Sequence, residues 1–252
     1  MNKIVLITGA TSGIGKACAE IFAQNHHNLI ICGRRSERLF QLSDELKNQY
    51  GIKVLPLDFD IRKRFEVEKS INMLKDEWRN IDILINNAGL AAGLSPIQEG
   101  DIDDWERMID TNMKGLLYIS RYVSPLMVER NQGHIINIGS VAGRETYPNG
   151  NVYCATKYAV DSLSKAMRID LLPYNIKVTQ VAPGAVQTEF SIVRFNGDTE
   201  KAANVYKGYL PLKPEDVAAV VYYTTTLPPH VNINDVLVMP TAQASATNVL
   251  RK

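Results

Sequence analysis

Ser140, Tyr153 and Lys157 have the types and spacing that acid–base chemistry on a hydroxyl or carbonyl group requires. Tyr153 and Lys157 are four positions apart in a segment whose apolar residues recur at helical spacing, so both side chains leave one helix face as neighbours. A free phenol, with a pKa of about 10, is a poor acid–base catalyst near pH 7. The adjacent ammonium would stabilise the phenolate and lower that pKa, which makes Tyr153 a candidate general acid–base.

The Tyr-x-x-x-Lys spacing occurs a second time, at Tyr209 and Lys213. Pro211 lies between these two residues and would break the helix that brings such a pair together. We interpret the second match as chance.

Seven short apolar segments have the composition of buried strands, and helical patterns separate them. Strict alternation of strands and helices implies a parallel sheet covered on both faces. We therefore predict an α/β protein with a single Rossmann-type, doubly wound domain over residues 1–252 and a parallel sheet of about seven strands. The strands are predicted at residues 4–7, 28–32, 54–57, 81–85, 134–138, 177–182 and 236–239. The helical patterns cover residues 14–22, 39–46, 67–78, 105–130 and 153–172, with a further helix start at Pro214.

The first strand meets the first helix at Thr8-Gly-Ala-Thr-Ser-Gly-Ile-Gly15. Glycines at this junction let backbone N–H groups approach a pyrophosphate at the positive end of the helix. The spacing differs from G-x-G-x-x-G, and as a bare string it suits any glycine-rich loop. Its position in the first βα unit favours phosphate binding. The candidate cofactor residues of this loop are Gly9, Thr11, Ser12, Gly13, Ile14 and Gly15.

Arg34 and Arg35 follow the second strand, where an NAD site usually has an acidic residue for the ribose 2′-hydroxyl. An arginine there accommodates the 2′-phosphate of NADP. The first acid after the strand is Glu37, beyond both arginines, so NADP is the predicted cofactor. The alternative is an arginine pair that merely opens a solvated helix.

The ends of three later strands carry further candidate cofactor contacts. An acid after the third strand is placed to accept from an adenine amino group, small residues after the fourth suit close approach, and the turn after the sixth could border the nicotinamide. Each segment could equally be an ordinary turn. The candidates are Asp58, Phe59, Asn86, Ala88, Gly89, Pro183, Gly184, Val186 and Thr188.

Composition excludes several other partners. Lys and Arg number 28 against 27 Asp and Glu, so the net charge of +1 offers no general basic surface for nucleic acid or an anionic membrane. No stretch approaches the roughly 18 apolar residues of a membrane span. The three cysteines lack metal-ligand spacing, which predicts no metal site and favours a reducing, cytoplasmic location. Cys154 adjoins Tyr153; we favour a small buried side chain there over a reactive thiol.

The chain resembles the short-chain dehydrogenase/reductase family over essentially its whole length. The resemblance rests on an ordered set of motifs: Thr8-Gly-x-x-x-Gly-Ile-Gly15, Asn86-Asn-Ala-Gly89, Asn112, Ser140, Tyr153-x-x-x-Lys157 and Pro183-Gly184. It narrows to the NADP-dependent 3-hydroxy acid dehydrogenases, which include serine and L-allo-threonine dehydrogenases. The closer match includes Gly33-Arg-Arg-Ser-Glu-Arg-Leu39, Thr188-Glu-Phe-Ser191 and the tail from His230 to Ser245.

The resemblance implies a role for each motif residue. Tyr153 would be the general acid–base, Lys157 would lower its pKa and hold the nicotinamide ribose, and Ser140 would bind the reacting oxygen. Asn112 would anchor a proton-relay water. The implied reaction is hydride transfer between NADP(H) and a 3-hydroxy acid in a homotetramer, with the helices from Trp105 and Tyr153 as interface candidates.

Two alternative functions stay open. One is the same chemistry on another carbonyl, such as a 3-oxoacyl thioester or a broad range of aldehydes and ketones. The other is a non-catalytic NADP-sensing protein, although a sensor has no need of the proton donor Tyr153.

A 3-hydroxy acid carries a carboxylate, and a planar guanidinium suits it best. Arg194 is the first candidate, because residues 189–212 form a strand-to-helix connection long enough to fold as a lid over the substrate. Arg194 could instead brace that lid or meet solvent. Arg144, close to Ser140 in sequence, is the competing candidate.

Overall fold

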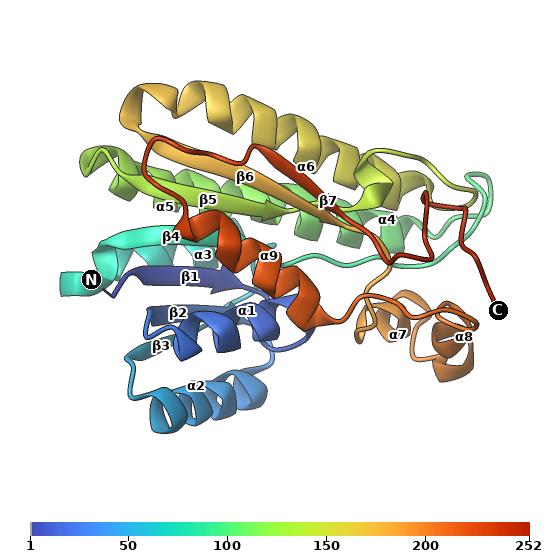
Figure 1. The fold of residues 1–252 in the computed structure, drawn as a ribbon, viewed down its shortest axis with the longest axis horizontal. Helices are drawn as coiled ribbons and strands as arrows, with labels where there is room; N and C mark the ends of the chain where they lie inside the picture. The colour runs from blue at the N-terminus through green and yellow to red at the C-terminus, as the bar shows by residue number, and fades with distance from the viewer. Residues whose placement is uncertain (1) are drawn as a thin grey trace.

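Seven parallel strands form one sheet in the computed structural model, which describes residues 2–252 (Figure 1). The sheet order is β3-β2-β1-β4-β5-β6-β7, so the winding direction reverses between β1 and β4. All seven predicted strands are confirmed to within one residue at each end, and so is the single α/β domain. The strands are β1 (Ile4–Thr8), β2 (Asn28–Gly33), β3 (Val54–Asp58), β4 (Ile81–Asn86), β5 (Gly133–Ile138), β6 (Ile176–Pro183) and β7 (Asp235–Val238).

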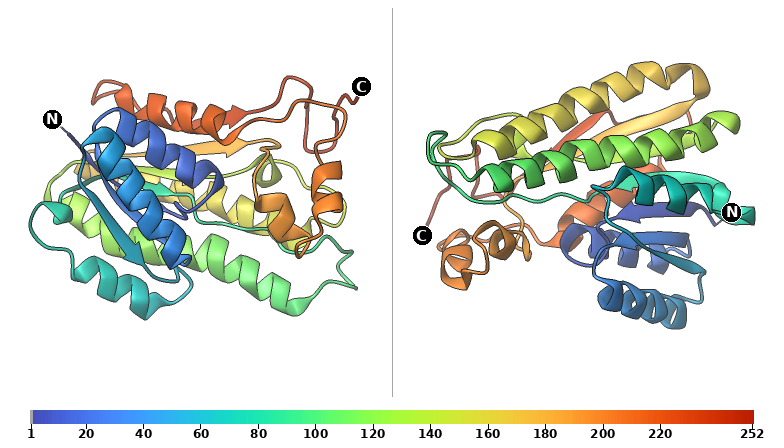
Figure 2. Two further views of the ribbon diagram at one scale, coloured as in Figure 1. Left: turned by 90° about the horizontal axis from the view of Figure 1, so that it is seen from below. Right: turned by 180° about the vertical axis from the view of Figure 1, so that it is seen from behind.

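Helices cover both faces of the sheet (Figure 2). One face packs against α1 (Gly13–Gln24), α2 (Ser36–Tyr50) and α9 (Pro214–Thr226), and the other against α3 (Arg64–Asn72), α5 (Leu116–Glu129) and α6 (Asn151–Asp170). Successive strand side chains alternate between these layers: Val5 and Ile7 join the first core, Ile4 and Leu6 the second. Both faces are therefore apolar, which explains the continuous apolar runs in the sequence.

The helix predicted over residues 67–78 is wrong in its second half. The α3 helix ends at Asn72, and Trp78 lies in a separate 3₁₀ turn, η1 (Asp76–Arg79). Asp76 has a φ of +49°, a left-handed conformation that cannot continue a right-handed helix. Leu74 lies beyond the end of the helix and is nevertheless buried. The apolar spacing therefore reflects burial in the core and not a continuous helix.

The long segment predicted from residue 105 consists of three helical pieces. It begins earlier, at α4 (Ile102–Ile109), because the Asp101 carboxylate caps the helix by accepting from the amides of Asp103 at 2.8 Å and Asp104 at 3.3 Å. A wide π-helical turn, η2 (Asp110–Gly115), follows and leads into α5. Such turns interrupt regular helices and are frequent at functional sites.

Residues 189–212, the predicted lid segment, contain two short helices that the sequence analysis did not predict, α7 (Phe190–Arg194) and α8 (Thr199–Asn204). They lie beyond the carboxyl ends of the strands (Figure 1). Two 3₁₀ turns complete the fold, η3 (Val141–Gly143) and η4 (Leu172–Tyr174). None of the helices within residues 2–252 has the length and apolarity needed to cross a membrane.

Candidate active site

A cleft of about 730 Å³ lies at the carboxyl ends of the strands, a size ordinary for a cofactor site. It runs from the end of β2 across the sheet to the start of α6. Most of the predicted site residues form its wall: Gly9, Thr11, Ser12, Gly13, Ile14, Arg34, Arg35, Phe59, Ala88, Gly89, Ser140, Tyr153, Lys157, Pro183, Gly184, Val186 and Thr188. Four predicted residues do not: Gly15, Asp58, Asn86 and Asn112.

The glycine loop between β1 and α1 depends on its three glycines. Gly9 and Gly13 have φ values of +66° and +51°, which L side chains rarely adopt. A Cβ on Gly15 would lie 2.3 Å from the Gly9 carbonyl oxygen, so Gly15 shapes the loop from behind and does not line the cleft. No side chain caps the first turn of α1, because Ser12 makes no capping hydrogen bond. The backbone amides of that turn therefore remain available to an anion.

Asn87 holds the glycine loop in place. Its Nδ2 donates to the carbonyl oxygens of Thr8 at 2.9 Å and Gly9 at 3.1 Å. The sequence analysis named Asn86 instead, and the structure corrects this. Asn86 is buried and donates from Nδ2 to Ser120 Oγ at 3.0 Å and to Asn137 Oδ1 at 2.8 Å, beneath α5. The period of two along β4 could have separated these neighbours, since Asn86 follows Leu84 toward the α5 layer.

The end of the cleft beside β2, where the adenosine of NADP is predicted to bind, is lined by Arg34 and Arg35. Arg35 donates to Ser12 Oγ at 2.6 Å and to Thr11 Oγ1 at 3.1 Å, so its guanidinium lies on the glycine loop. Arg34 lies 3.7 Å from an oxygen of Asp60. The carboxylates of Asp60 and Glu189 pair with these two arginines, and the uncapped helix end lies beside them.

Asp58 lies at the end of β3, outside the cleft wall. It is exposed, and its carboxylate accepts a hydrogen bond from the Ser36 hydroxyl. Phe59, Asp60 and Ile61 form the wall after β3. An exposed carboxylate that accepts one hydrogen bond can accept more, so the contact of Asp58 to an adenine amino group stays a prediction.

Ser140, Tyr153 and Lys157 meet at the other end of the cleft, and all three are buried. Ser140 caps η3, its Oγ accepting from the Ala142 amide at 3.1 Å. Lys157 Nζ donates to the Ile138 carbonyl at 2.9 Å and lies 6.0 Å from the centre of the Tyr153 ring. The helical spacing predicted from sequence thus brings the phenol and the ammonium to one place.

Burial dominates the ionisation of both groups. It raises the pKa of the Tyr153 phenol, and the neighbouring Ser140 hydroxyl and Arg194 charge partly oppose that rise. Burial also lowers the pKa of Lys157 to about 8, so the ammonium still predominates at pH 7. The sequence predicts that Lys157 lowers the pKa of Tyr153. That effect would act against the rise in the Tyr153 pKa that burial causes.

Asn112 lies behind the cleft, in the π-helical turn. Its Oδ1 accepts from the Leu90 amide at 2.8 Å, and its Nδ2 donates to the Leu90 carbonyl at 2.8 Å and to Thr156 Oγ1 at 3.0 Å. Thr156 in turn donates to the Tyr153 carbonyl at 2.8 Å. The Asn112 side chain thus joins η2, the loop after β4 and the helix that carries Tyr153.

Arg194 reaches the catalytic end of the cleft from the last residue of α7. Its NH1 donates to the Tyr147 hydroxyl at 2.9 Å and its Nε to the Gly93 carbonyl at 3.3 Å. The centre of the guanidinium lies 5.4 Å from the Tyr147 ring and 5.7 Å from the Tyr153 ring. Phe190, at the other end of α7, packs edge-on against Tyr153 with ring centres 5.6 Å apart.

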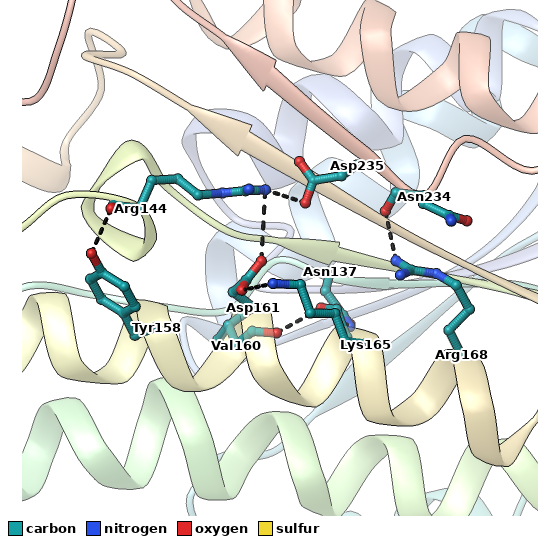
Figure 3. Close-up of polar contacts among 10 residues, drawn as sticks. Asn137, Arg144, Tyr158, Val160, Asp161, Lys165, Arg168, Asn234 and Asp235 are labelled. Atoms are coloured by element: carbon teal, nitrogen blue, oxygen red, sulfur yellow. Dashed lines mark hydrogen bonds and ion pairs between the residues drawn. The ribbon is translucent and has the colours of Figure 1, made fainter.

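Arg144, the competing candidate, is committed elsewhere (Figure 3). Its guanidinium pairs with Asp235 of β7 and lies 3.7 Å from Asp161 of α6, and it does not line the cleft. Its own carbonyl accepts from the Tyr158 hydroxyl at 2.5 Å. The Arg144 guanidinium thus links α6 to β7 at the edge of the sheet. Of the two arginines considered for the substrate carboxylate, Arg194 remains the candidate.

The C-terminal tail supplies wall residues that sequence reasoning did not assign. Gln243, Ala246 and Arg251 line the cleft. Gln243 Oε1 accepts from the Ala185 amide at 2.8 Å, which ties the tail to the turn after β6. Nothing in the local sequence signals these contacts, although the tail was part of the resemblance.

Possible metal ligands and cysteines were compared with the geometry of residues 2–252. Residues 2–252 contain no group of three His, Cys, Asp or Glu side chains able to hold a metal ion. Cys18, Cys32 and Cys154 are buried free thiols, and burial raises the pKa of all three. Cys154 therefore behaves as the small packing residue predicted from the sequence.

Comparison with known proteins identifies the class to which this fold and site belong. The model of the short chain dehydrogenase family matches residues 3–198. The chain belongs to the short-chain dehydrogenase family, as the sequence resemblance predicted.

Individual relatives are similar over nearly the whole chain. The NADP-dependent 3-hydroxy acid dehydrogenase YdfG of Salmonella typhi is 51% identical over 244 residues, covering 96% of this chain and 97% of that protein. The NADP-dependent 3-hydroxy acid dehydrogenase of Schizosaccharomyces pombe is 44% identical, covering 100% and 97%. The closed form of a serine dehydrogenase complexed with NADP⁺ superposes with a TM-score of 0.92 at 49% identity, covering 99% and 100%.

Proposed function

We propose that this chain is a dehydrogenase that transfers a hydride between NADP(H) and a 3-hydroxy acid. The observation that carries the proposal is the content of one cleft. Its adenosine end holds two arginines beside a glycine loop, and its other end holds the buried Ser140, Tyr153 and Lys157 with the Arg194 guanidinium beside them. The names of the similar proteins support the same activity and cofactor.

The residues of the cleft fit NADP. The uncapped first turn of α1 and the small glycine loop suit a pyrophosphate. Gly13 also lies close to Thr188, since a Cβ at this position would meet the Thr188 side chain at 3.2 Å. Arg34 and Arg35 would hold the 2′-phosphate. The nicotinamide end would lie against Gly89, Lys157 and Thr188. Bound there, NADP⁺ supplies the acceptor for the hydride that leaves the carbon bearing the hydroxyl group.

The chain's own residues would manage the proton. Tyr153, as phenolate, accepts the hydroxyl proton of the substrate, and in the reverse direction the phenol returns it to the carbonyl oxygen. Ser140 donates a hydrogen bond to the same oxygen, which steadies the charge that develops on it. Burial disfavours the phenolate, and the positive charge of Arg194 opposes that effect. The ammonium of Lys157, one helical turn away, would act in the same direction.

Asn112 would support this proton transfer through the main chain. Its side chain is occupied by Leu90 and Thr156, so a water that relays the proton would bind a backbone carbonyl of the π-helical turn. In that turn the regular ladder of backbone hydrogen bonds is altered.

Arg194 would recognise the substrate carboxylate. A guanidinium has five N–H donors, and within residues 2–252 only two of those of Arg194 have protein partners, Gly93 and Tyr147. The remaining donors suit two-point binding of a carboxylate next to Tyr153. This charge distinguishes the proposed function from its main alternative, the reduction of neutral aldehydes, ketones or thioesters, which have no use for a cation there.

The test of the proposal is a panel that follows NADPH absorbance with purified protein. L-serine, L-allo-threonine and 3-hydroxypropionate are offered with NADP⁺ and with NAD⁺, beside neutral alcohols, aldehydes and a 3-oxoacyl thioester. We expect turnover on the hydroxy acids with NADP⁺. Preference for a neutral carbonyl would favour the alternative reductase, and NADP binding with no turnover on any compound would favour a sensor.

Cofactor preference is tested by replacing Arg34 and Arg35 together with Ala. The two side chains are 50% and 42% exposed, so solvent screens their interactions and about 1–2 kcal/mol of phosphate binding is expected to disappear. Calorimetric affinity for NADP⁺ should fall by about 5- to 30-fold, and affinity for NAD⁺ should stay within about twofold. Equal losses for both cofactors would contradict the assignment.

The family resemblance also suggests a cytoplasmic homotetramer. Exposed apolar side chains on α5 and α6, including Leu117, Tyr158 and Ile169, support an interface on that face of the sheet, and the free cysteines suit a reducing compartment. Light scattering on the purified protein should give four times the mass of one chain; a monomer would contradict the assembly.

A further inference from the structure

An ion pair joins the lid segment to the far end of the cleft. Glu189, the residue before α7, lies 2.7 Å from Arg35 and 2.9 Å from Arg38, both near the start of α2. A second contact from Arg38 spans 3.2 Å. Glu189 and Arg35 both line the cleft. The ion pair therefore connects the adenosine end of the cleft to the lid segment.

The Glu189 carboxylate is the anionic group that Arg35 and Arg38 hold in this structure. Arg35 also donates to Thr11 and Ser12 of the glycine loop, so its guanidinium faces the phosphate region. The Arg35 hydrogen bond is the main reason that the pKa of Glu189 is held below its usual range. Carboxylate and phosphate monoester groups both present oxygen acceptors to the planar N–H donors of a guanidinium, so the two groups can bind the same arginine.

The lid helix that Glu189 starts bears directly on the catalytic end. Phe190 packs on the Tyr153 ring, and Arg194 lies beside that ring at the other end of α7. The Glu189 carbonyl accepts from the Val193 amide at 3.0 Å, so the position of Glu189 sets the first turn of α7. A change at the arginines can therefore reach the substrate residues through five residues of chain.

We infer that Glu189 is an internal competitor of the cofactor's 2′-phosphate for Arg35. A 2′-phosphate displaces the Glu189 carboxylate and releases α7, whereas the 2′-hydroxyl of NAD leaves the ion pair closed. Glu189 thereby selects between cofactors and links that choice to the state of the lid. The inference rests on the proposed use of NADP.

The test compares Glu189→Gln with wild type by calorimetry, using NADP⁺ and NAD⁺ as ligands. Glutamine keeps the shape of the side chain and removes its charge. Because exposed ion pairs are individually weak, we expect NADP⁺ to bind roughly three- to tenfold more tightly to the variant, with NAD⁺ unchanged within about twofold. Glu77→Gln, which removes an equal charge from an exposed pair with Lys53, is the matched control and should change neither affinity.

A second readout follows the lid itself by hydrogen exchange. Adenosine 2′-monophosphate, which carries the phosphate but no nicotinamide, should speed exchange of the Val193 and Phe195 amides in wild type, while adenosine 5′-monophosphate should not. In Glu189→Gln these amides should exchange fast without ligand. Unchanged or weaker NADP⁺ binding by the variant, or amide exchange indifferent to the 2′-phosphate, would overturn the inference. If wild type itself binds NADP⁺ no better than NAD⁺, the proposed cofactor is wrong instead, so the two failures are distinguishable.

Discussion

Tyr153→Phe should still bind NADP⁺ but lose roughly 10²–10⁴-fold in turnover, the range that a general acid–base group contributes. The substitution removes one hydroxyl oxygen from a buried ring and keeps the packing against Phe190. The proton of the substrate hydroxyl then has no acceptor at the reacting oxygen. Steady-state rates with 3-hydroxypropionate, together with calorimetric affinity for NADP⁺, check the prediction.

Tyr158→Phe is the matched control for that experiment. Tyr158 lies on the same helix, is 42% exposed, and gives its hydroxyl to the Arg144 carbonyl away from the cleft. Its loss should leave turnover within about twofold, because an exposed hydrogen bond contributes little to stability and nothing to the chemistry. Turnover of Tyr153→Phe within about twofold of wild type would sink the assignment of the acid–base.

Arg194→Ala should lower kcat/KM on 3-hydroxy acids by about 30-fold or more, which corresponds to about 2 kcal/mol. The guanidinium is part-buried beside Tyr147 and Tyr153, so a carboxylate desolvated there loses a charge-assisted, two-point partner. Neutral alcohols of similar size, which make no such contact, should change by less than about threefold.

The ratio between the two substrate classes is the measurement, because any distortion of the lid affects both alike. Equal losses on acids and neutral alcohols would mean that Arg194 only braces α7 through Gly93 and Tyr147. Since Arg144 is paired with Asp235 and lies outside the cleft, the carboxylate would then need a partner from another part of the wall.

The sheet could be predicted from sequence because both of its faces are buried. A continuous apolar run such as residues 4–7 is typical of a strand buried on both faces, and the helical stripes between the strands fix the alternation. The predicted helix over residues 67–78 was wrong in its second half, where buried residues keep a helical spacing although the backbone is not helical. Leu74 and Trp78 continue the spacing of α3, yet the helix ends at Asn72 and the left-handed backbone at Asp76 keeps it from resuming.

The site was predictable where its residues are close in sequence or follow a strand. Tyr153 and Lys157 are one helical turn apart, and Arg34 and Arg35 come directly after β2. Residues brought in by long-range contacts gave no local signal. Tyr147 becomes a site residue only through Arg194, and Gln243 only through the turn after β6. Asn86 and Asn87 are adjacent but face opposite layers, a distinction that a motif string does not carry.

The central claim is that one cleft uses NADP⁺ to oxidise a hydroxyl whose neighbouring carboxylate is held by Arg194. The most direct test compares kcat/KM of the wild-type protein for 3-hydroxypropionate and for its amide, 3-hydroxypropionamide, with NADP⁺ as cofactor. The two compounds have nearly the same size and the same reacting carbon, and differ in charge. The account predicts that the acid is preferred by at least about tenfold. An amide turned over as well as the acid would contradict it.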